Sequence, residues 1–175
     1  MNYVGLDLSL RGAGVCVLNQ SGEVLHTVKV GYALKRSSRV KDKVERMLCI
    51  AKAIVRVIDE YTVRNDGHLL TKHTHPMVGI EGYAFSGRGS ALFDLGELGG
   101  VVKSQLWLRF AVEPALIASS SGRKVVLGNG RMKKVDVIPQ LEKKYGLLFT
   151  EHDIADAYVV AKTLQMRSEP PHHRG

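Results

Sequence analysis

The N-terminal region consists of three apolar or β-branched segments separated by short turn sequences. The segments are residues 3–10, 13–18 and 23–30. Arg11-Gly12 separates the first two, and residues 19–22 (NQSG) separate the second from the third. These residue types favour tight turns, and strands joined so closely pair as antiparallel neighbours. The sequence therefore predicts a three-stranded antiparallel meander.

Helical and extended patterns alternate along the rest of the chain. Residues 39–65 carry apolar side chains at helical spacing, and such a long crossing helix makes the next strand pairing parallel. Pro76 begins a short apolar run, 76–82, which we interpret as a buried strand ending at Glu81. The remaining expected elements are a Gly- and Ser-rich loop (86–90), a helix (91–109), a strand (111–118) and two helices (131–145 and 153–166). The pattern predicts an α/β fold with a five-stranded mixed sheet, the meander plus parallel strands, flanked by helices.

Composition limits the classes of protein that fit the sequence. The 175 residues are 45% hydrophobic and 24% charged, which predicts one domain, 1–167, followed by a polar tail, 168–175. A net charge of +8 suits a polyanionic partner such as nucleic acid. With no basic-then-apolar leader, a cytoplasmic protein with no membrane partner and no small-molecule substrate is expected. Cys16 and Cys49 lie in apolar patterns without metal-ligand spacing, so both are expected to be reduced core thiols.

Four acidic residues lie at the ends of apolar strands or at a helix start. Asp7 and Glu81 belong to two strands that would bring them together if the strands are neighbours. Asp153 and Asp156 are three residues apart on a helix and so share one face. Taken singly, each has an ordinary explanation as a helix cap, a turn carboxylate or a solvated residue. Together, they predict a four-carboxylate pocket that needs a compensating cation.

Oxygen ligands without paired Cys or His residues select Mg²⁺, with Mn²⁺ as a substitute, over zinc. Two such ions would activate a water and stabilise the leaving oxygen of an in-line displacement at phosphorus. The predicted reaction is therefore phosphodiester hydrolysis with two ions per active site.

Four ordered motifs resemble the RuvC-type Holliday junction resolvases, especially their phage-encoded relatives. The motifs are GLDLSLRGAGVCVL (5–18), VGIEGYAFSGRGSA (78–91), VVLGNGRMKKVDVI (125–138) and HDIADAYVVA (152–161). The resemblance implies a ribonuclease H-like fold with Asp7, Glu81, Asp153 and Asp156 as the metal ligands. It also implies a homodimer, in the host cytoplasm if phage-encoded, that nicks two strands of a four-way DNA junction symmetrically.

Basic residues around the third motif are candidate DNA contacts. Lys133 and Lys134 follow Gly128-Asn129-Gly130, where backbone amides and a helix start could meet phosphate. The resemblance implies that a lysine here contacts the scissile phosphate region, and we assign Lys134 to catalysis. Five further basic residues extend this surface: Arg123, Lys124, Arg131, Lys143 and Lys144. Each of them taken alone also fits a solvated charge.

The loop after Glu81 carries Tyr83, Phe85 and Arg88. An aromatic side chain here could stack on an unpaired base at the junction centre, and the resemblance implies this role for one of the two. Core packing is an equal alternative for each. His152 directly precedes Asp153 and could be an outer-shell base or an additional metal ligand. Ser9 lies two residues after Asp7, and its hydroxyl could position water or phosphate or could cap a turn. The histidines at 68, 73 and 75 are assigned no chemistry.

Helix 91–109 is apolar nearly all round and contains Gly96, Gly99 and Gly100. Because apolar residues lie nearly all round this helix, we expect other elements to cover it on two sides. Each glycine lowers helix stability by about 1 kcal/mol at an exposed position but permits a second helix to approach closely, so we expect the homodimer interface here. Burial within one chain is the alternative.

Three other functions fit parts of the sequence. A ribosomal-RNA-processing nuclease of the same fold would cut RNA without regard to junction geometry. Sugar kinases and actin-like ATPases share a similar first strand and turn, but they need a second domain for which this chain has no room. A catalytically silent DNA-binding module would not require all four acidic residues.

Overall fold

The N-terminal meander is present as predicted. The structure, a computed structural model, describes residues 1–31, 41–63, 75–82 and 90–168. Its first three strands are β1 (Tyr3–Ser9), β2 (Gly12–Leu18) and β3 (Val24–Gly31), paired antiparallel in chain order. In the second turn, the Asn19 side-chain carbonyl accepts the Glu23 amide hydrogen at 2.9 Å and Gly22 adopts a φ of 83°. Side-chain capping and a positive φ are the chemistry expected from NQSG.

The later strands extend the sheet in parallel. Helix α1 (Lys41–Val63) leads to β4 (Met77–Glu81), which pairs with β1 so that Ile80 lies opposite Leu6. β5 (Ala115–Ile117) adds to the other edge of β4, giving the order β3-β2-β1-β4-β5. This confirms the five-stranded mixed sheet. β5 is shorter than predicted, because Ala111 has a φ of 53° and Pro114 cannot donate to a strand ladder.

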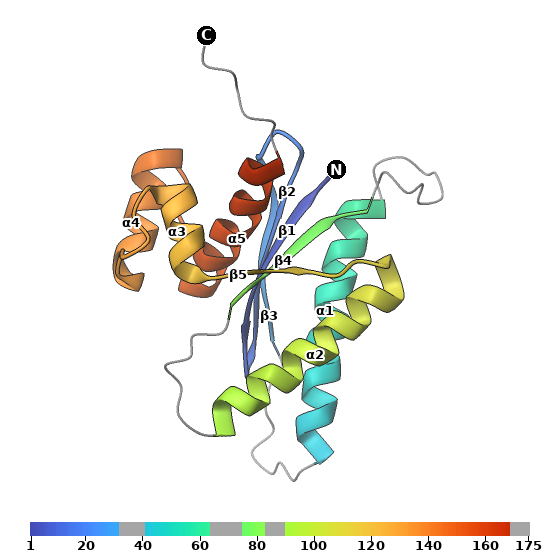
Figure 1. Ribbon diagram of the computed structural model, residues 1–175. Coiled ribbons are helices and arrows are strands. Elements are labelled where there is room, and N and C mark those ends of the chain that lie inside the picture. Colours follow the sequence, from blue (N-terminus) through green and yellow to red (C-terminus); the bar gives the residue numbers. More distant parts are fainter. Residues whose placement is uncertain (32–40, 64–74, 83–89, 169–175) are drawn as a thin grey trace.

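Helices cover both faces of the sheet (Figure 1). α1 and α2 (Ser90–Phe110) pack on one face, against the even-numbered side chains of β1. α3 (Ser119–Leu127), α4 (Lys134–Tyr145) and α5 (His152–Ser168) lie on the other face. The strand alternation therefore directs Asp7 toward α5, away from the layer formed by α1 and α2.

α5 lies on the sheet with almost no space between them. A Cβ atom added to Gly5 would lie 1.9 Å from the Ala157 carbonyl oxygen, and one added to Gly14 would lie 2.1 Å from the Asp153 carbonyl oxygen. Such distances are far below van der Waals contact, so the absence of a side chain at both positions permits this approach. The close packing lowers the second turn of α5, with Asp156, onto the end of β1.

Several expectations need correction. Helix α3 was not predicted, α4 begins at Lys134 instead of residue 131, and only Asp153 of the two aspartates lies in the first turn of α5. Cys16 is buried as expected, but Cys49 is exposed because it lies on the outer face of α1. Residues 83–89 and 169–175, with most of the predicted loop and polar tail, lie outside the described residues.

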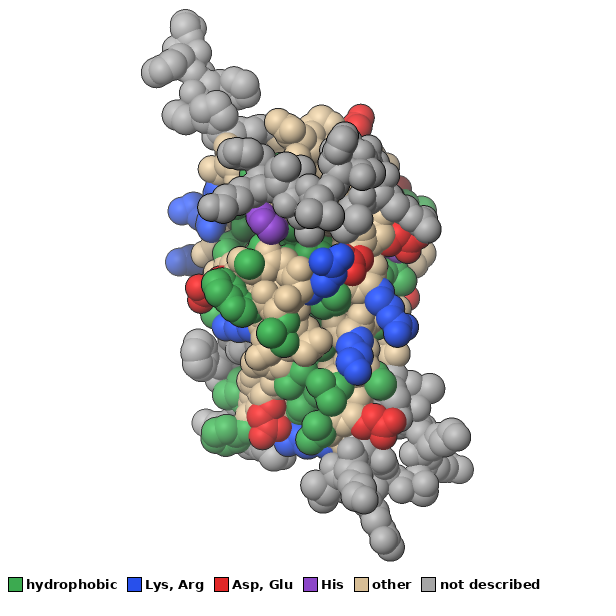
Figure 2. Space-filling view, turned by 90° about the vertical axis from the view of Figure 1, so that its right-hand side faces the viewer, with side chains coloured by type: hydrophobic (Ala, Val, Ile, Leu, Met, Phe, Trp, Pro, Cys, Tyr) green, Lys and Arg blue, Asp and Glu red, His purple; other side chains and the backbone are tan. Residues whose placement is uncertain are grey.

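The described residues cover α2 on one side only. Phe93, Trp107 and Leu108 are 76%, 60% and 77% exposed. Figure 2 views the molecule from the side that carries α1 and α2, and hydrophobic side chains lie there among basic and acidic ones. The expected cover on two sides is therefore wrong for the chain taken alone. None of the described helices combines the length and the hydropathy needed to span a bilayer.

Candidate active site

Three carboxylates from different parts of the chain meet at one end of the sheet. Asp7 and Glu81 follow the paired residues Leu6 and Ile80, so they are neighbours across the parallel strands. Asp156, 3% exposed, reaches them from α5. Each of the three offers an oxygen, and these oxygens all lie within 4.8 Å of one another. We call Asp7, Glu81 and Asp156 the carboxylate triad.

The triad is electrostatically unfavourable without a cation. Burial, followed by the nearby carboxylates of Glu81 and Asp156, raises the pKa of Asp7 to about 9, although Lys134 opposes the shift. The structure therefore favours a proton on Asp7 at neutral pH, because three adjacent negative charges in a buried setting repel one another. A divalent cation can replace that proton.

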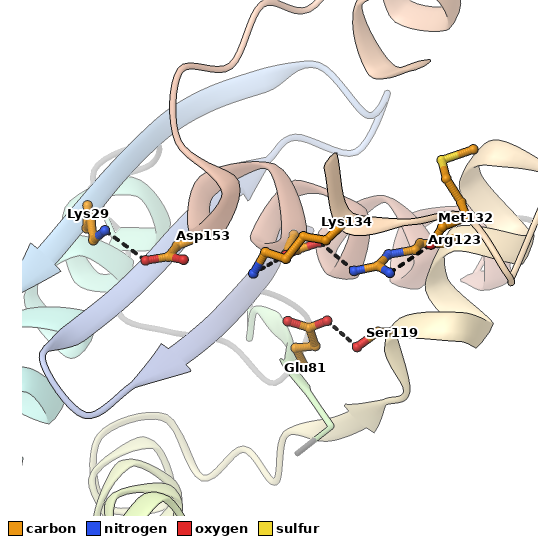
Figure 3. A network of polar contacts seen from close by, with 8 residues as sticks. Lys29, Glu81, Ser119, Arg123, Met132, Lys134 and Asp153 are labelled. Carbon is orange, nitrogen blue, oxygen red and sulfur yellow. Dashed lines mark hydrogen bonds and ion pairs between the residues drawn. The ribbon is translucent and has the colours of Figure 1, made fainter. Parts of the chain in front are cut away.

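Two basic residues and one hydroxyl hold the triad (Figure 3). Lys134 Nζ lies 2.9 Å from Asp156 Oδ2, and Arg123 Nη2 lies 3.4 Å from Asp156 Oδ1. Arg123 also donates to the Met132 carbonyl at 3.1 Å, which fixes the guanidinium. The Ser119 hydroxyl donates to Glu81 Oε1. Partial burial opposes the charge of Lys134, but hydrogen bonding to Asp156 and the attraction of the triad raise its pKa above the usual value.

A pocket of about 810 Å³ opens over the triad. Its lining combines polar side chains, those of Asp7, Glu81, Ser119, Arg123 and Lys134, with apolar ones, those of Leu8, Leu95 and Leu116. The volume exceeds what metal ions alone would fill, and it is sufficient for a phosphodiester with part of a nucleoside.

The donor set fits Mg²⁺ or Mn²⁺. The ligand oxygens are all carboxylates, which hard divalent cations prefer. Asp156 Oδ2 is buried, and its contact among the described residues is the ion pair with Lys134 Nζ at 2.9 Å. A buried carboxylate oxygen with capacity for a further contact is a suitable metal ligand.

The fourth predicted ligand lies apart from the triad. Asp153 is one turn before Asp156 on α5, and its Oδ2 is 2.8 Å from Lys29 Nζ on β3 (Figure 3). Lys29 also lies 2.9 Å from Glu151 Oε2. Three of the four predicted carboxylates are therefore brought together, while the fourth is held by a lysine.

The other predicted site residues differ in their surroundings. Lys124, Arg131 and Lys133 are exposed near the pocket, whereas Arg123 is largely buried against Asp156. The Ser9 hydroxyl donates to the Gly12 carbonyl at 3.3 Å and thus closes the first turn. His152 Nδ1 is buried and has no hydrogen-bond partner among the described residues. Tyr83, Phe85 and Arg88 lie outside the described residues.

Sequence reasoning missed Ser119 and Lys29. Ser119 begins the unpredicted helix α3, and three consecutive serines before a capping glycine, Gly128, were the available signal for that helix. Lys29 could be identified only from the register of β3 against β2.

The raised pKa of Asp7 predicts that the free energy of unfolding of the protein, measured without metal, falls as the pH rises. The folded-state pKa of Asp7, about 9, exceeds the ordinary value of 3.8, so the folded protein binds this proton more tightly than the unfolded chain does. The stability that results is lost as the pH rises from 3.8 to about 9. Asp7→Asn should therefore raise the free energy of unfolding at pH 9 by about 2 kcal/mol, and by less at pH 5. Urea titrations in chelator would measure both.

Millimolar Mg²⁺ should stabilise wild type at pH 8 more than the Asp7→Asn variant. Equal responses of the two proteins to Mg²⁺ would contradict this prediction.

The chain was compared with known proteins. No protein-family model and no curated protein matches it. Among solved structures, it is similar to RuvC from Thermus thermophilus, with a TM-score of 0.68, 18% identity, and coverage of 93% of this chain and 92% of that chain. A structure of T. thermophilus RuvC in complex with Holliday junction substrate gives a TM-score of 0.67, 18% identity, and coverage of 93% and 91%. The predicted RuvC-like, ribonuclease H-like fold is thereby confirmed.

Proposed function

We propose that this chain is a metal-dependent endonuclease that cuts branched DNA and resolves Holliday junctions by symmetric phosphodiester hydrolysis. The carboxylate triad beside Lys134, in a pocket large enough for a phosphodiester, is the observation that carries the proposal. A fold shared with a protein that was solved with a Holliday junction supports the choice of substrate.

Asp7, Glu81 and Asp156 would hold Mg²⁺, with Asp153 completing a site for two ions. The ions would supply an activated water and a Lewis acid for the leaving oxygen. The chain itself orients the ligands: Ser119 fixes Glu81, and Arg123 holds one oxygen of Asp156. Lys134 would move from Asp156 toward a non-bridging phosphate oxygen, because a metal ion competes for the same carboxylate.

Lys134→Ala is expected to slow single-turnover junction cleavage by about a hundredfold, since it removes a preorganised positive charge beside the reacting phosphate. Lys133→Ala is the matched control, because Lys133 is the adjacent exposed lysine and its side chain makes no capping hydrogen bond at the start of α4. That variant should weaken binding in a salt-dependent way with little change in the chemical step. Equal effects of the two substitutions on the chemical step would count against the role of Lys134.

Exposed basic residues would extend the DNA surface from the pocket. Lys124, Arg131 and Lys133 are solvent-accessible, and the chain carries a net charge of +8. We propose that Arg123 mainly positions Asp156 and does not primarily contact DNA, because its guanidinium already contacts the Asp156 carboxylate and the Met132 carbonyl. Tyr83, Phe85 and Arg88 remain proposed junction contacts on the basis of sequence. Affinity should fall steeply with salt.

A homodimer formed through α2 is the proposed assembly. Phe93, Gly96, Gly100 and Trp107 recur at spacings of three, four and seven residues and so share one helix face. Among the described residues, no atom outside the neighbouring backbone of α2 lies within 4 Å of a Cβ added to Gly96 or Gly100, and Phe93 and Trp107 are exposed. Glycines with free space around them, placed between exposed aromatic residues, would allow a second helix to pack closely on α2.

Leu108→Asp should convert the dimer to a monomer, because Leu108 is 77% exposed at the flank of this face, next to Trp107, and a charge there would be desolvated by the partner. Sedimentation equilibrium at micromolar protein would measure the change. Leu148→Asp is the control, since Leu148 is 72% exposed but follows α4. A variant at Leu108 that sediments like wild type would exclude α2 from the interface.

Cleavage of labelled nucleic acids in Mg²⁺ tests the function directly. The substrates are an immobile four-way junction, a replication fork, a linear duplex and structured RNA. Paired symmetric nicks confined to the junction support a resolvase, and cutting of the fork as well indicates broader activity on branched DNA. RNA cutting would instead favour the ribosomal-RNA-processing alternative. Tight binding to the junction without any cutting would favour a catalytically silent module.

A further inference from the structure

Asp153 lies between a metal ligand and a lysine. β1, β2 and β3 carry Asp7, Gly14 and Lys29 in one row of paired residues, so these positions share the face that α5 covers. A Cβ on Gly14 would lie 2.1 Å from the Asp153 carbonyl oxygen. Asp153 is therefore placed over the middle of the row, with Asp7 one strand away on one side and Lys29 one strand away on the other.

Asp153 turns toward Lys29 in the structure. Its carboxylate lies 2.8 Å from Lys29 Nζ, on the far side from Glu81 and Lys134 (Figure 3). The Asp153 side chain is 26% exposed, so it is not locked by packing. Adjacent strands are about 4.8 Å apart, so rotation about the side-chain bonds of Asp153 is enough to exchange one neighbour for the other.

Glu151 gives Lys29 a second partner. Its Oε2 lies 2.9 Å from Lys29 Nζ, and the Glu151 side chain is 45% exposed. If Asp153 turned toward the triad, Lys29 would keep an ion pair and would remain on the sheet edge. The release of Asp153 therefore leaves no charge without a partner.

We propose that Lys29 is a positioning residue that competes with a metal ion for Asp153 and so sets the affinity of the site for its second ion. This inference rests on the proposed metal-dependent function. The triad alone supplies three carboxylates for the first ion. The second ion requires Asp153, and its binding must break the contact between Asp153 and Lys29.

The test measures Mn²⁺ binding to the metal-free full chain by electron paramagnetic resonance of the unbound ion. Lys29→Met should tighten the weaker binding event about fivefold, which is the effect expected from removing a partly exposed ion pair. Lys29→Arg keeps the charge and should retain wild-type affinity. Lys43→Met is the matched control, because Lys43 likewise bridges two carboxylates, Asp94 and Glu97, both at 2.6 Å, but joins α1 to α2.

Two double variants separate competition for Asp153 from a general loss of positive charge. In the Lys29→Met background, Asp153→Asn should abolish the gain in affinity, whereas Glu151→Gln should preserve it. A gain that depends on Glu151, or an equal gain in Lys43→Met, would overturn the proposal. So would wild-type affinity in Lys29→Met. Failure of the wild-type chain to bind Mn²⁺ at all would instead overturn the proposed function, and the role of Lys29 with it.

Discussion

Asp7→Asn is expected to abolish junction cleavage, with a loss of about a thousandfold or more, while junction binding stays intact or tightens. The substitution removes one of the three converging carboxylates that would hold the metal, and metal ions contribute several kcal/mol to charge stabilisation in a transition state. In chelator, the raised pKa of Asp7 already favours its neutral form, so the amide leaves the charge beside the DNA phosphate nearly unchanged and binding is not weakened. Gel-shift titrations in chelator and single-turnover cleavage in Mg²⁺ would measure the two effects separately.

Asp136→Asn provides the matched control for this experiment. Asp136 lies in the first turn of α4, two residues after Lys134, and is exposed outside the carboxylate triad. The same change of charge there should leave cleavage within about threefold of wild type, because a solvated surface charge contributes little. Full cutting by Asp7→Asn would remove Asp7 from the metal site.

Gly5→Ala should destabilise the protein by about 3 kcal/mol or more, the largest stability effect expected from a single methyl group in this chain. The added carbon would lie 1.9 Å from the Ala157 carbonyl oxygen and 2.5 Å from the Ala161 amide nitrogen. Both contacts are backbone atoms of α5, so no side chain can rotate away and the whole helix must shift. Urea unfolding would measure the loss.

Gly96→Ala is the opposite case, since the added carbon would meet no atom within 4 Å from other elements in the described part of the chain. In the interior of α2, alanine should stabilise the helix by about 0.5–1 kcal/mol. Both substitutions are best made in the monomeric Leu108→Asp background, so that dimer contacts do not enter the comparison. A destabilised Gly96→Ala together with a neutral Gly5→Ala would contradict the packing of α5 on the sheet.

The main elements of the fold could be predicted because their sequence patterns are local. The meander depends on turn residues such as those at 19–22, and α1 depends on apolar residues repeated at helical spacing. The parallel pairing of β4 with β1 followed from the long crossover between them. These signals need no knowledge of distant residues.

Helix α3 could not be predicted with the same ease because distant contacts stabilise it. Its sequence, SSSGRKVVL, contains weak helix formers, and its apolar end resembles a strand. In the structure, Gly122 lies against Val159 of α5 and Val126 is fully buried. Missing this helix also meant missing the role of Ser119 beside Glu81.

The candidate site was predictable in its ligand types but not in their orientation. Acidic residues at the ends of apolar strands signalled the meeting of Asp7 with Glu81, because parallel register follows from topology. The orientation of Asp153 toward Lys29 depends on the lateral register of three strands and on the absence of a side chain at Gly14. A one-dimensional pattern contains no such information.

The close packing of α5 on the sheet also bears on ion size. Asp7 and Glu81 are fixed to the sheet and Asp156 to the helix, so the separation of these two layers sets the radius of the coordination sphere between them. Mg²⁺ binds oxygen at about 2.0–2.1 Å, whereas Ca²⁺ needs about 2.3–2.6 Å and more ligands. A helix that rests on bare glycine backbone cannot approach the sheet further, and any side chain at Gly5 would widen the gap. Gly5 and Gly14 would thereby restrict which divalent ion the carboxylates can enclose, although neither glycine would contact the ion.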